Sequence, residues 1–153
     1  MMDAGFDGVH LDLEPLRPDD GDYPKLLERL RPAVHGRGGV LPVAAHQIDP
    51  LPGLRTVGGT AVGEGTWWSQ RFFGRVARRV DRIALMSYDT WLPLESPSGG
   101  YVARQTELAL QAAPDGVDPL MGLPFLPTDD LGHHAGAEAV SAAVRGGGGW
   151  GWG

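Results

Sequence analysis

The segment at residues 6–15 constrains the fold of this chain more than any other. Aliphatic and ionisable residues alternate strictly there, with Val9, Leu11 and Leu13 against His10, Asp12 and Glu14. Strand side chains point to opposite faces with a period of two, so the segment predicts a strand with one aliphatic and one ionisable face. Adjacent acids on one face are unfavourable unless water solvates them or a function uses them. The alternative to a functional strand is an edge strand with a wet acidic face.

The rest of the chain alternates between predicted helices and predicted strands. Helices are predicted where apolar residues recur at i, i+3, i+4 and i+7, and strands at short apolar runs. After the first strand, the helices span Tyr23 to Val34, Trp67 to Val80, Tyr101 to Ala112 and Ala137 to Val144, and the strands span Val40 to Ala45, Arg82 to Met86 and Leu120 to Leu123. Three aspartates at positions 19, 20 and 22 precede the first helix, where carboxylates favour a helix start. The order β-α-β-α-β-α-β-α is typical of a parallel sheet with right-handed crossovers.

Three strand motifs carry a family resemblance. Asp7, Asp12 and Glu14 fit the pattern Asp-x-x-Asp-x-Asp-x-Glu, with His10 in place of its second Asp. Residues 83–89 contain Met-Ser-Tyr-Asp, and residues 121–125 read Met-Gly-Leu-Pro-Phe. The three motifs resemble, in order, the active-site strand, the Met-x-Tyr-Asp strand and the Gly-x-Pro-Phe strand of glycoside hydrolase family 18, the chitinase-like family. The resemblance covers most of the chain from Gly5 to about Phe125.

The resemblance implies an α/β fold, a parallel β/α barrel of the TIM type. Glu14 ends the first predicted strand and Tyr88 with Asp89 ends the third, and the loops after the strands form the functional face of such a barrel. A complete barrel needs about 250 residues, so the 153-residue chain is expected to form one partial domain with about four to five of eight units. These units resemble strands four to eight. We expect a fragment of a longer protein rather than a barrel completed by another chain, and exposed barrel edges are expected to favour self-association.

The resemblance also implies a role for each candidate site residue. Substrates of this family supply their own acetamido group as the nucleophile, so a single carboxylic acid serves as general acid. Glu14 matches that acid, Asp12 the residue that orients the acetamido group, and Tyr88 the hydroxyl that hydrogen-bonds the acetamido oxygen. The candidate sugar-binding residues are His10, His46, Asp89, Trp91 and Trp152. The expected activity is cleavage of β-linked N-acetylated glycans, with a carbohydrate as the partner.

Several alternatives stay open at this point. His10 stands where the family has an acid, and it either donates a hydrogen bond to Asp12 as a structural residue or acts on the acids as a cation. A non-catalytic carbohydrate-binding relative is a second function, although such relatives typically lose the general acid, whereas Glu14 is retained. An inert truncated fragment of a longer hydrolase is the third.

Composition narrows the remaining function classes. The formal charge of −6 argues against a nucleic-acid partner, which needs a basic surface. The five arginines between residues 71 and 82 lie opposite an apolar stripe, and this favours a solvated outer face over a binding patch. No cysteine is present, no metal site or cofactor is expected, and the chain shows no signal peptide and no membrane-spanning stretch. Localisation is left open, since a longer protein could be secreted.

Overall fold

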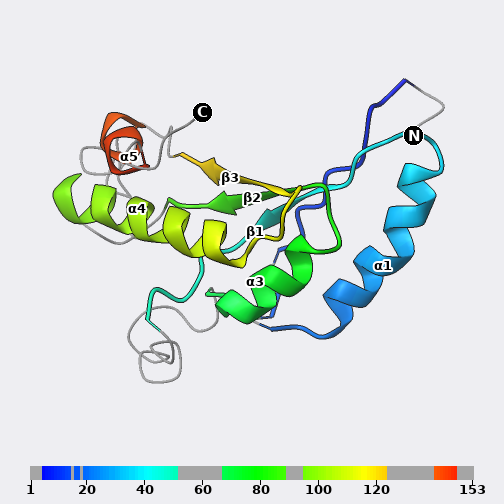
Figure 1. The fold of residues 1–153 in the computed structure, drawn as a ribbon, viewed down its shortest axis with the longest axis horizontal. Helices are drawn as coiled ribbons and strands as arrows, with labels where there is room; N and C mark the ends of the chain where they lie inside the picture. Colours follow the sequence, from blue (N-terminus) through cyan, green and yellow to red (C-terminus); the bar gives the residue numbers. More distant parts are fainter. Residues whose placement is uncertain are drawn as a thin grey trace.

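The computed structural model describes residues 5–14, 16–17, 19–51, 67–88, 95–123 and 140–147. In chain order its elements are α1 (Asp22–His35), β1 (Pro42–Ala45), α3 (Gln70–Ala77), β2 (Arg82–Met86), α4 (Glu95–Ala112), β3 (Asp118–Gly122) and α5 (Val140–Gly147) (Figure 1). The predicted alternation of helices and strands is confirmed in this part of the chain. Helix α4 begins six residues before its predicted start at Tyr101.

The three strands form one parallel sheet in the order β1-β2-β3. Residues 7–11 lie along the free edge of β1, where Gly8 bridges Val40 and Leu11 bridges Val43. The predicted first strand is therefore only partly right: its pairing with β1 is parallel, but it consists of two isolated bridges and no continuous strand to Glu14. Beyond Leu11 the chain leaves the sheet edge, and its acidic side chains are exposed to solvent.

The hydrophobic core lies between one face of the sheet and the helices α1, α3 and α4, which Figure 1 shows along one side of the strands. The spacing of apolar residues predicts that the helix over Trp67 to Val80 buries five residues, and all five are at most 1% exposed, namely Phe72, Phe73, Val76, Ala77 and Val80. From the sheet, Val43, Ile83 and Leu85 are fully buried. Three apolar residues that were expected to point inward are exposed instead: Leu26 of α1 at 39%, Leu13 at 42%, and Ala33 of α1.

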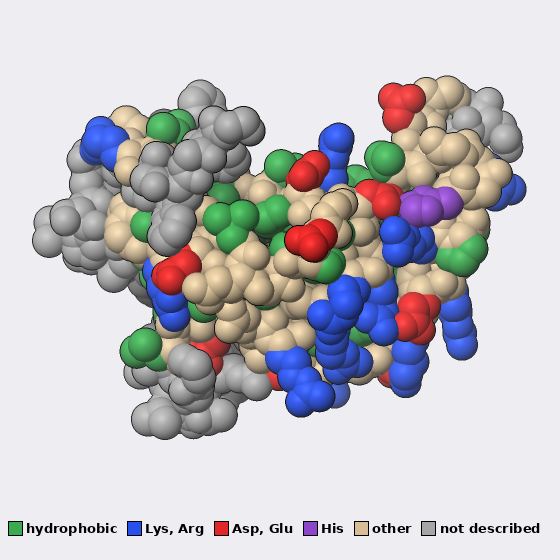
Figure 2. Space-filling model, in the orientation of Figure 1, with side chains coloured by type: hydrophobic (Ala, Val, Ile, Leu, Met, Phe, Trp, Pro, Cys, Tyr) green, Lys and Arg blue, Asp and Glu red, His purple; other side chains and the backbone are tan. Residues whose placement is uncertain are grey.

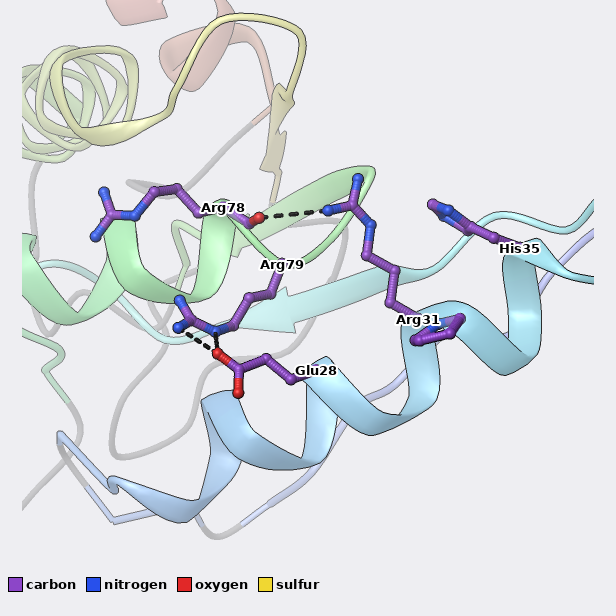
Figure 3. Close-up of a pocket in the computed structure, with 6 residues that line it drawn as sticks. Glu28, Arg31, His35, Arg78 and Arg79 are labelled. Carbon is purple, nitrogen blue, oxygen red and sulfur yellow. Dashed lines mark hydrogen bonds and ion pairs between the residues drawn. The ribbon is translucent and has the colours of Figure 1, made fainter.

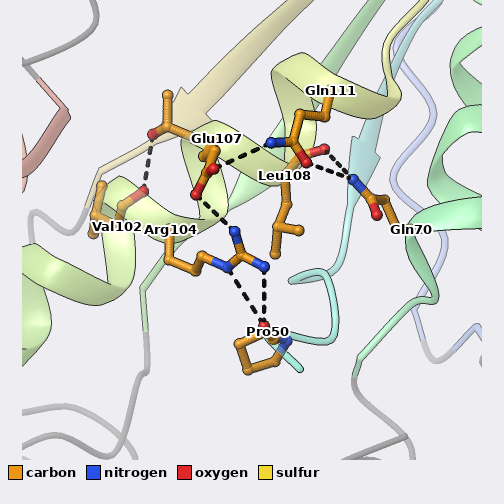
Figure 4. Close-up of polar contacts among 8 residues, drawn as sticks. Pro50, Gln70, Val102, Arg104, Glu107, Leu108 and Gln111 are labelled. Atoms are coloured by element: carbon orange, nitrogen blue, oxygen red, sulfur yellow. Dashed lines mark hydrogen bonds and ion pairs between the residues drawn. The ribbon is translucent and has the colours of Figure 1, made fainter. Parts of the chain in front are cut away.

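Helix α4 holds the loop that follows β1. The amide of Gln105 is fully buried and binds both backbone groups of Ile48: Oε1 accepts from its N–H at 2.7 Å and Nε2 donates to its carbonyl at 2.7 Å. The preceding residue, Arg104, donates to the carbonyl of Pro50 and pairs with Glu107 (Figure 4). Buried backbone groups without partners are unfavourable, so these contacts fix residues 46–51 at the end of β1.

The acidic run before α1 is only partly a helix cap. Asp20 accepts a hydrogen bond from the N–H of Asp22 at 2.8 Å, whereas the N-cap residue is Gly21, which supplies no side chain. Asp19 instead accepts from the hydroxyl of Ser69 at 2.7 Å, and the Ser69 oxygen accepts from the first turn of α3. The loop after the acidic segment is therefore tied to α3.

Among the described residues, no helix is long and apolar enough to cross a membrane.

Candidate active site

The face of the sheet opposite the helices carries the ionisable residues. His10, Asp12 and Glu14 are exposed there, while Val9 and Leu11 pack against the core on the other side. The predicted alternation is thus confirmed for these five residues. Neighbouring side chains on the same face, such as Ala44, Ala84 and Met86, are only half-buried, so the face is open in the described part of the chain.

Glu14 lies beside His46. Residues 14 and 46 each lie three positions beyond the bridged pair Leu11 and Val43, and the distance from Glu14 Oε1 to His46 Nε2 is 3.9 Å. The His46 side chain is 19% exposed and its ring meets the buried ring of Trp68 edge-on at 6.1 Å, whereas the Glu14 side chain is 53% exposed. His46 is thus supported from the core, and Glu14 faces solvent.

Asp12 lies close enough to Tyr23, in the first turn of α1, to affect the pKa of its phenol. Burial raises the pKa of the Tyr23 phenol to about 12, and the negative charge of Asp12 adds to the increase. The Tyr23 ring also meets Trp68 edge-on, at 6.1 Å. Trp68 therefore contacts Tyr23, which lies near Asp12, and His46, which lies near Glu14.

Tyr88 continues β2 on the same open face. The phenol ring of Tyr88 lies over Gly122 of β3, which has no side chain. A Cβ atom on Gly122 would lie only 3.3 Å from Cε1 of Tyr88. The carbonyl of Tyr88 accepts from Nε2 of Gln47, and Oε1 of Gln47 accepts from Trp67 at 3.0 Å and from Tyr101 at 2.8 Å. Neighbouring strands lie about 4.8 Å apart, so the acidic segment and β2, on either side of β1, are about 10 Å apart.

The structure therefore brings together five of the predicted site residues on one face: Glu14, Asp12, Tyr88, His10 and His46. Asp89, Trp91 and Trp152 lie outside the described residues. Sequence reasoning missed Gln47, whose amide joins three segments and has no local signal in the sequence. Within the described ranges, no group of three or more acids and histidines is arranged to hold a metal ion. The arrangement offers two exposed acidic side chains and a phenol across β1, which suits proton transfer to a substrate that lies along the face.

No protein-family model matches this chain, and no curated protein matches it. Among solved structures, the spore cortex-lytic enzyme SleL of Bacillus cereus is similar with a TM-score of 0.57 and 18% identity, over 94% of this chain and 33% of that one. A chitinase of Chromobacterium violaceum gives a TM-score of 0.55 and 19% identity, over 76% and 36% of the two chains. A putative sporulation-specific glycosylase of Bacillus subtilis, ydhD, gives 0.55 and 21%, over 78% and 38%.

This chain shares its fold with part of these glycan-processing enzymes. The parallel sheet with helices on one face is consistent with part of a β/α barrel. At these identities the likeness concerns the fold alone. The chain spans about a third of the length of each neighbour, from 33% to 38% of the three described above.

Gly8 is expected to be indispensable for the placement of the acidic segment. A Cβ atom at Gly8 would lie 2.3 Å from the carbonyl oxygen of Val40, so Gly8→Ala forces the segment away from β1. We expect a loss of about 1–3 kcal/mol of unfolding free energy, as for other overpacked sites, and faster hydrogen exchange at the amides of Val9 and Leu11. The matched control is Gly100→Ala in α4, where a Cβ meets no atom within 4 Å. That variant should gain up to about 1 kcal/mol, and equal stability of both variants would contradict the close contact.

The Tyr23 phenol provides a pH test of the Asp12 position. Because folding raises its pKa from 10.0 to about 12, the neutral phenol stabilises the fold fully below pH 10. That stability is lost as the pH rises towards the folded value. Asp12→Asn should lower the pKa of Tyr23 while leaving the larger part of the increase, which comes from burial. The check is an NMR titration of the Tyr23 ring, with Asp7→Asn, on the opposite side of the segment's alternation, as the unchanged control. An identical Tyr23 pKa in Asp12→Asn would contradict this placement.

Proposed function

We propose that the open face of the sheet is the active site of a glycoside hydrolase that cleaves β-linked N-acetylated glycans. The observation that carries the proposal is the position of Glu14 and Asp12 on that face, with Tyr88 on the same face beyond β1. The fold supports it, because the structural neighbours are named as chitinases, glycosylases and cortex-lytic enzymes.

In this proposal Glu14 protonates the oxygen of the leaving sugar. Its side chain is exposed to an incoming substrate, and His46 lies 3.9 Å away as a polar neighbour that orients the carboxyl group. Asp12 holds the acetamido group of the sugar, whose carbonyl oxygen attacks the anomeric carbon as the leaving oxygen takes the proton from Glu14. Tyr88 donates a hydrogen bond to that acetamido oxygen. His10, two residues before Asp12 in the segment, donates a hydrogen bond to the Asp12 carboxylate.

We also propose that residues 1–153 form a single partial barrel domain of a longer protein, which we call the longer barrel. The open face, with half-buried Ala44, Ala84 and Met86, would then line the inside of the barrel. The further sugar contacts proposed for this site are Asp89, Trp91 and Trp152. The partner is a carbohydrate.

The competing function is a carbohydrate-binding protein without turnover. The two are separated by incubating the longer barrel with an oligomer of N-acetylglucosamine and measuring both bound oligomer and new reducing ends. A hydrolase releases reducing ends in proportion to enzyme and time. Saturable binding with no release over days would favour the binding protein, and the absence of both would reject the sugar site.

A further inference from the structure

Charged groups on the helical side of the molecule bind one another. In a hollow of about 550 Å³ between α1 and the end of α3, Glu28 binds Nε of Arg79 at 2.7 Å and Arg31 donates to the carbonyl of Arg78 (Figure 3). Asp81 lies 3.6 Å from Arg31 on the same side. Figure 2 shows lysine and arginine side chains gathered over α1 and α3. The polar contacts that bear on the candidate site lie elsewhere, at the ends of the strands.

The amide of Gln47 lies just beyond β1 and contacts three segments. Its Nε2 donates to the carbonyl of Tyr88, and its Oε1 accepts from the indole N–H of Trp67 at 3.0 Å and from the hydroxyl of Tyr101 at 2.8 Å. An indole N–H can only donate and a carbonyl can only accept, so the two partners fix which way round the amide lies. Burial raises the pKa of the Tyr101 phenol, which keeps its hydroxyl protonated as a donor.

The Gln47 side chain binds Tyr88 where the backbone of β1 leaves β2. The two strands pair in register as far as Ala45 of β1. Beyond it, the carbonyl of Gln47 accepts from the N–H of Trp68 at 2.8 Å, and the N–H of Asp49 donates to the carbonyl of Trp68 at 2.9 Å. Because this backbone is bonded to Trp68, the carbonyl of Tyr88 receives its hydrogen bond from the Gln47 amide instead.

On the other side, β3 holds the end of β2. Ser87 is 1% exposed and donates to the carbonyl of Gly122 through its hydroxyl at 2.6 Å and its N–H at 3.3 Å. The ring of Tyr88 lies over the same glycine. The backbone at Tyr88 is therefore held between β3 on one side and the Gln47 amide on the other.

We propose that Gln47 is a positioning residue for the candidate reaction: its amide fixes the backbone of Tyr88, and with it the reach of the phenol towards the acetamido group. The role in the reaction rests on the proposed function, whereas the contact between Gln47 and Tyr88 does not. Displacing a group by about 1 Å from the reacting atoms can lower the rate by about 10²-fold. Gln47 acts through Tyr88 and needs no contact with the substrate.

The geometry is tested by NMR on the 153-residue chain. Gln47→Glu has nearly the same shape and keeps an oxygen for Trp67 and Tyr101, but its ionised carboxylate cannot donate to the carbonyl of Tyr88. We expect the carbonyl ¹³C resonance of Tyr88 to shift and the NOEs between its ring and Hα of Gly122 to weaken. Gln47→Met is the second variant, because it loses the same hydrogen bond and introduces no charge. Unchanged NOEs in either folded variant would overturn the proposal.

Gln111→Glu is the matched control for Gln47→Glu. It makes the same change at an exposed amide of α4, which binds Gln70 and Glu107 (Figure 4). The resonances and NOEs of Tyr88 should stay as they are in the unaltered chain. Equal changes in Gln111→Glu and Gln47→Glu would overturn the proposal, since they would reflect added negative charge alone.

The role in the reaction is tested by a double-mutant cycle in the longer barrel with an N-acetylglucosamine oligomer. Tyr88→Phe should lower kcat by about 10²-fold, as for one lost donor to a developing charge. Gln47→Glu should lower kcat by about 10-fold and leave KM within about twofold, because the phenol acts in the transition state. In the Tyr88→Phe background, Gln47→Glu should cost less than about twofold, since the hydroxyl it positions is missing. The same loss in both backgrounds would make Gln47 a merely structural residue and overturn the proposal.

Failure of the hydrolase proposal gives a different result from failure of this one. If the unaltered longer barrel releases no reducing ends, the hydrolase and the role of Gln47 in its reaction are rejected together, while the NMR test still reports on the contact with Tyr88. If the unaltered barrel turns over the oligomer and Gln47→Glu does so equally well, only the role of Gln47 is rejected.

Discussion

Glu14→Gln is expected to lower the turnover of an N-acetylglucosamine oligomer by about 10²–10⁴-fold, the usual contribution of a general acid. Glutamine keeps the shape of the side chain and its hydrogen bonding but has no proton to give to the leaving oxygen. Since Glu14 is 53% exposed and contributes nothing to the core, the substitution should leave the melting temperature unchanged. The measurement is the initial rate of reducing-end release by the longer barrel at saturating oligomer.

The matched control is Glu107→Gln, which makes the same change in α4, where Glu107 pairs with Arg104. An exposed or half-exposed pair of this kind contributes at most about 1 kcal/mol, so turnover should stay within about twofold of the unaltered protein. Full activity in Glu14→Gln would remove Glu14 as the acid. Equal losses in both variants would point to a general effect on folding.

Trp68→Ala is expected to be the most destabilising single change near the site, at about 3–5 kcal/mol. The side chain is 1% exposed and contacts the rings of Tyr23, His46 and Phe72. Its indole nitrogen is buried and has no hydrogen-bond partner among the described residues, so the loss is one of packing. Urea unfolding followed by circular dichroism measures the effect.

Phe6→Ala serves as the control for Trp68→Ala, because Phe6 is an aromatic residue that is 61% exposed. Its replacement should change the free energy of unfolding by less than about 0.5 kcal/mol. A change of less than 1 kcal/mol in Trp68→Ala would contradict a central place for this ring in the core. In that case, residues other than Trp68 would have to hold His46 and Tyr23 in place.

The elements with strong periodicity could be predicted from the sequence alone. The bounds predicted for β2, Arg82 to Met86, agree with the structure, and the inward stripe of α3 is confirmed. Phe72, Val76 and Val80 recur at a helical spacing and need only a nearby apolar surface to be buried. The first strand was harder to predict, because alternation alone does not show how far a chain stays paired at a sheet edge. The two bridges at Gly8 and Leu11 depend on the close approach to Val40 and Val43.

The face that carries the candidate site could be predicted from the sequence, but the residues that hold its side chains in place could not. Alternation from Val9 to Glu14 was enough to place Asp12 and Glu14 on one side of the segment. Gln47, by contrast, binds groups 20, 41 and 54 residues away in the chain, and no local pattern marks such an amide. The contact between Glu14 and His46 likewise depends on how residues 7–11 align with β1, and the local sequence does not determine that alignment.

The central claim, a hydrolase that uses the acetamido group of its own substrate, is tested most directly with a pair of oligomers. The longer barrel is given an N-acetylglucosamine oligomer and the deacetylated oligomer of the same length, and the release of reducing ends is measured for both. The account predicts cleavage of the acetylated oligomer and a rate for the deacetylated one that is lower by about 10²-fold or more, since the neighbouring nucleophile is missing. Equal rates for the two oligomers would contradict the account.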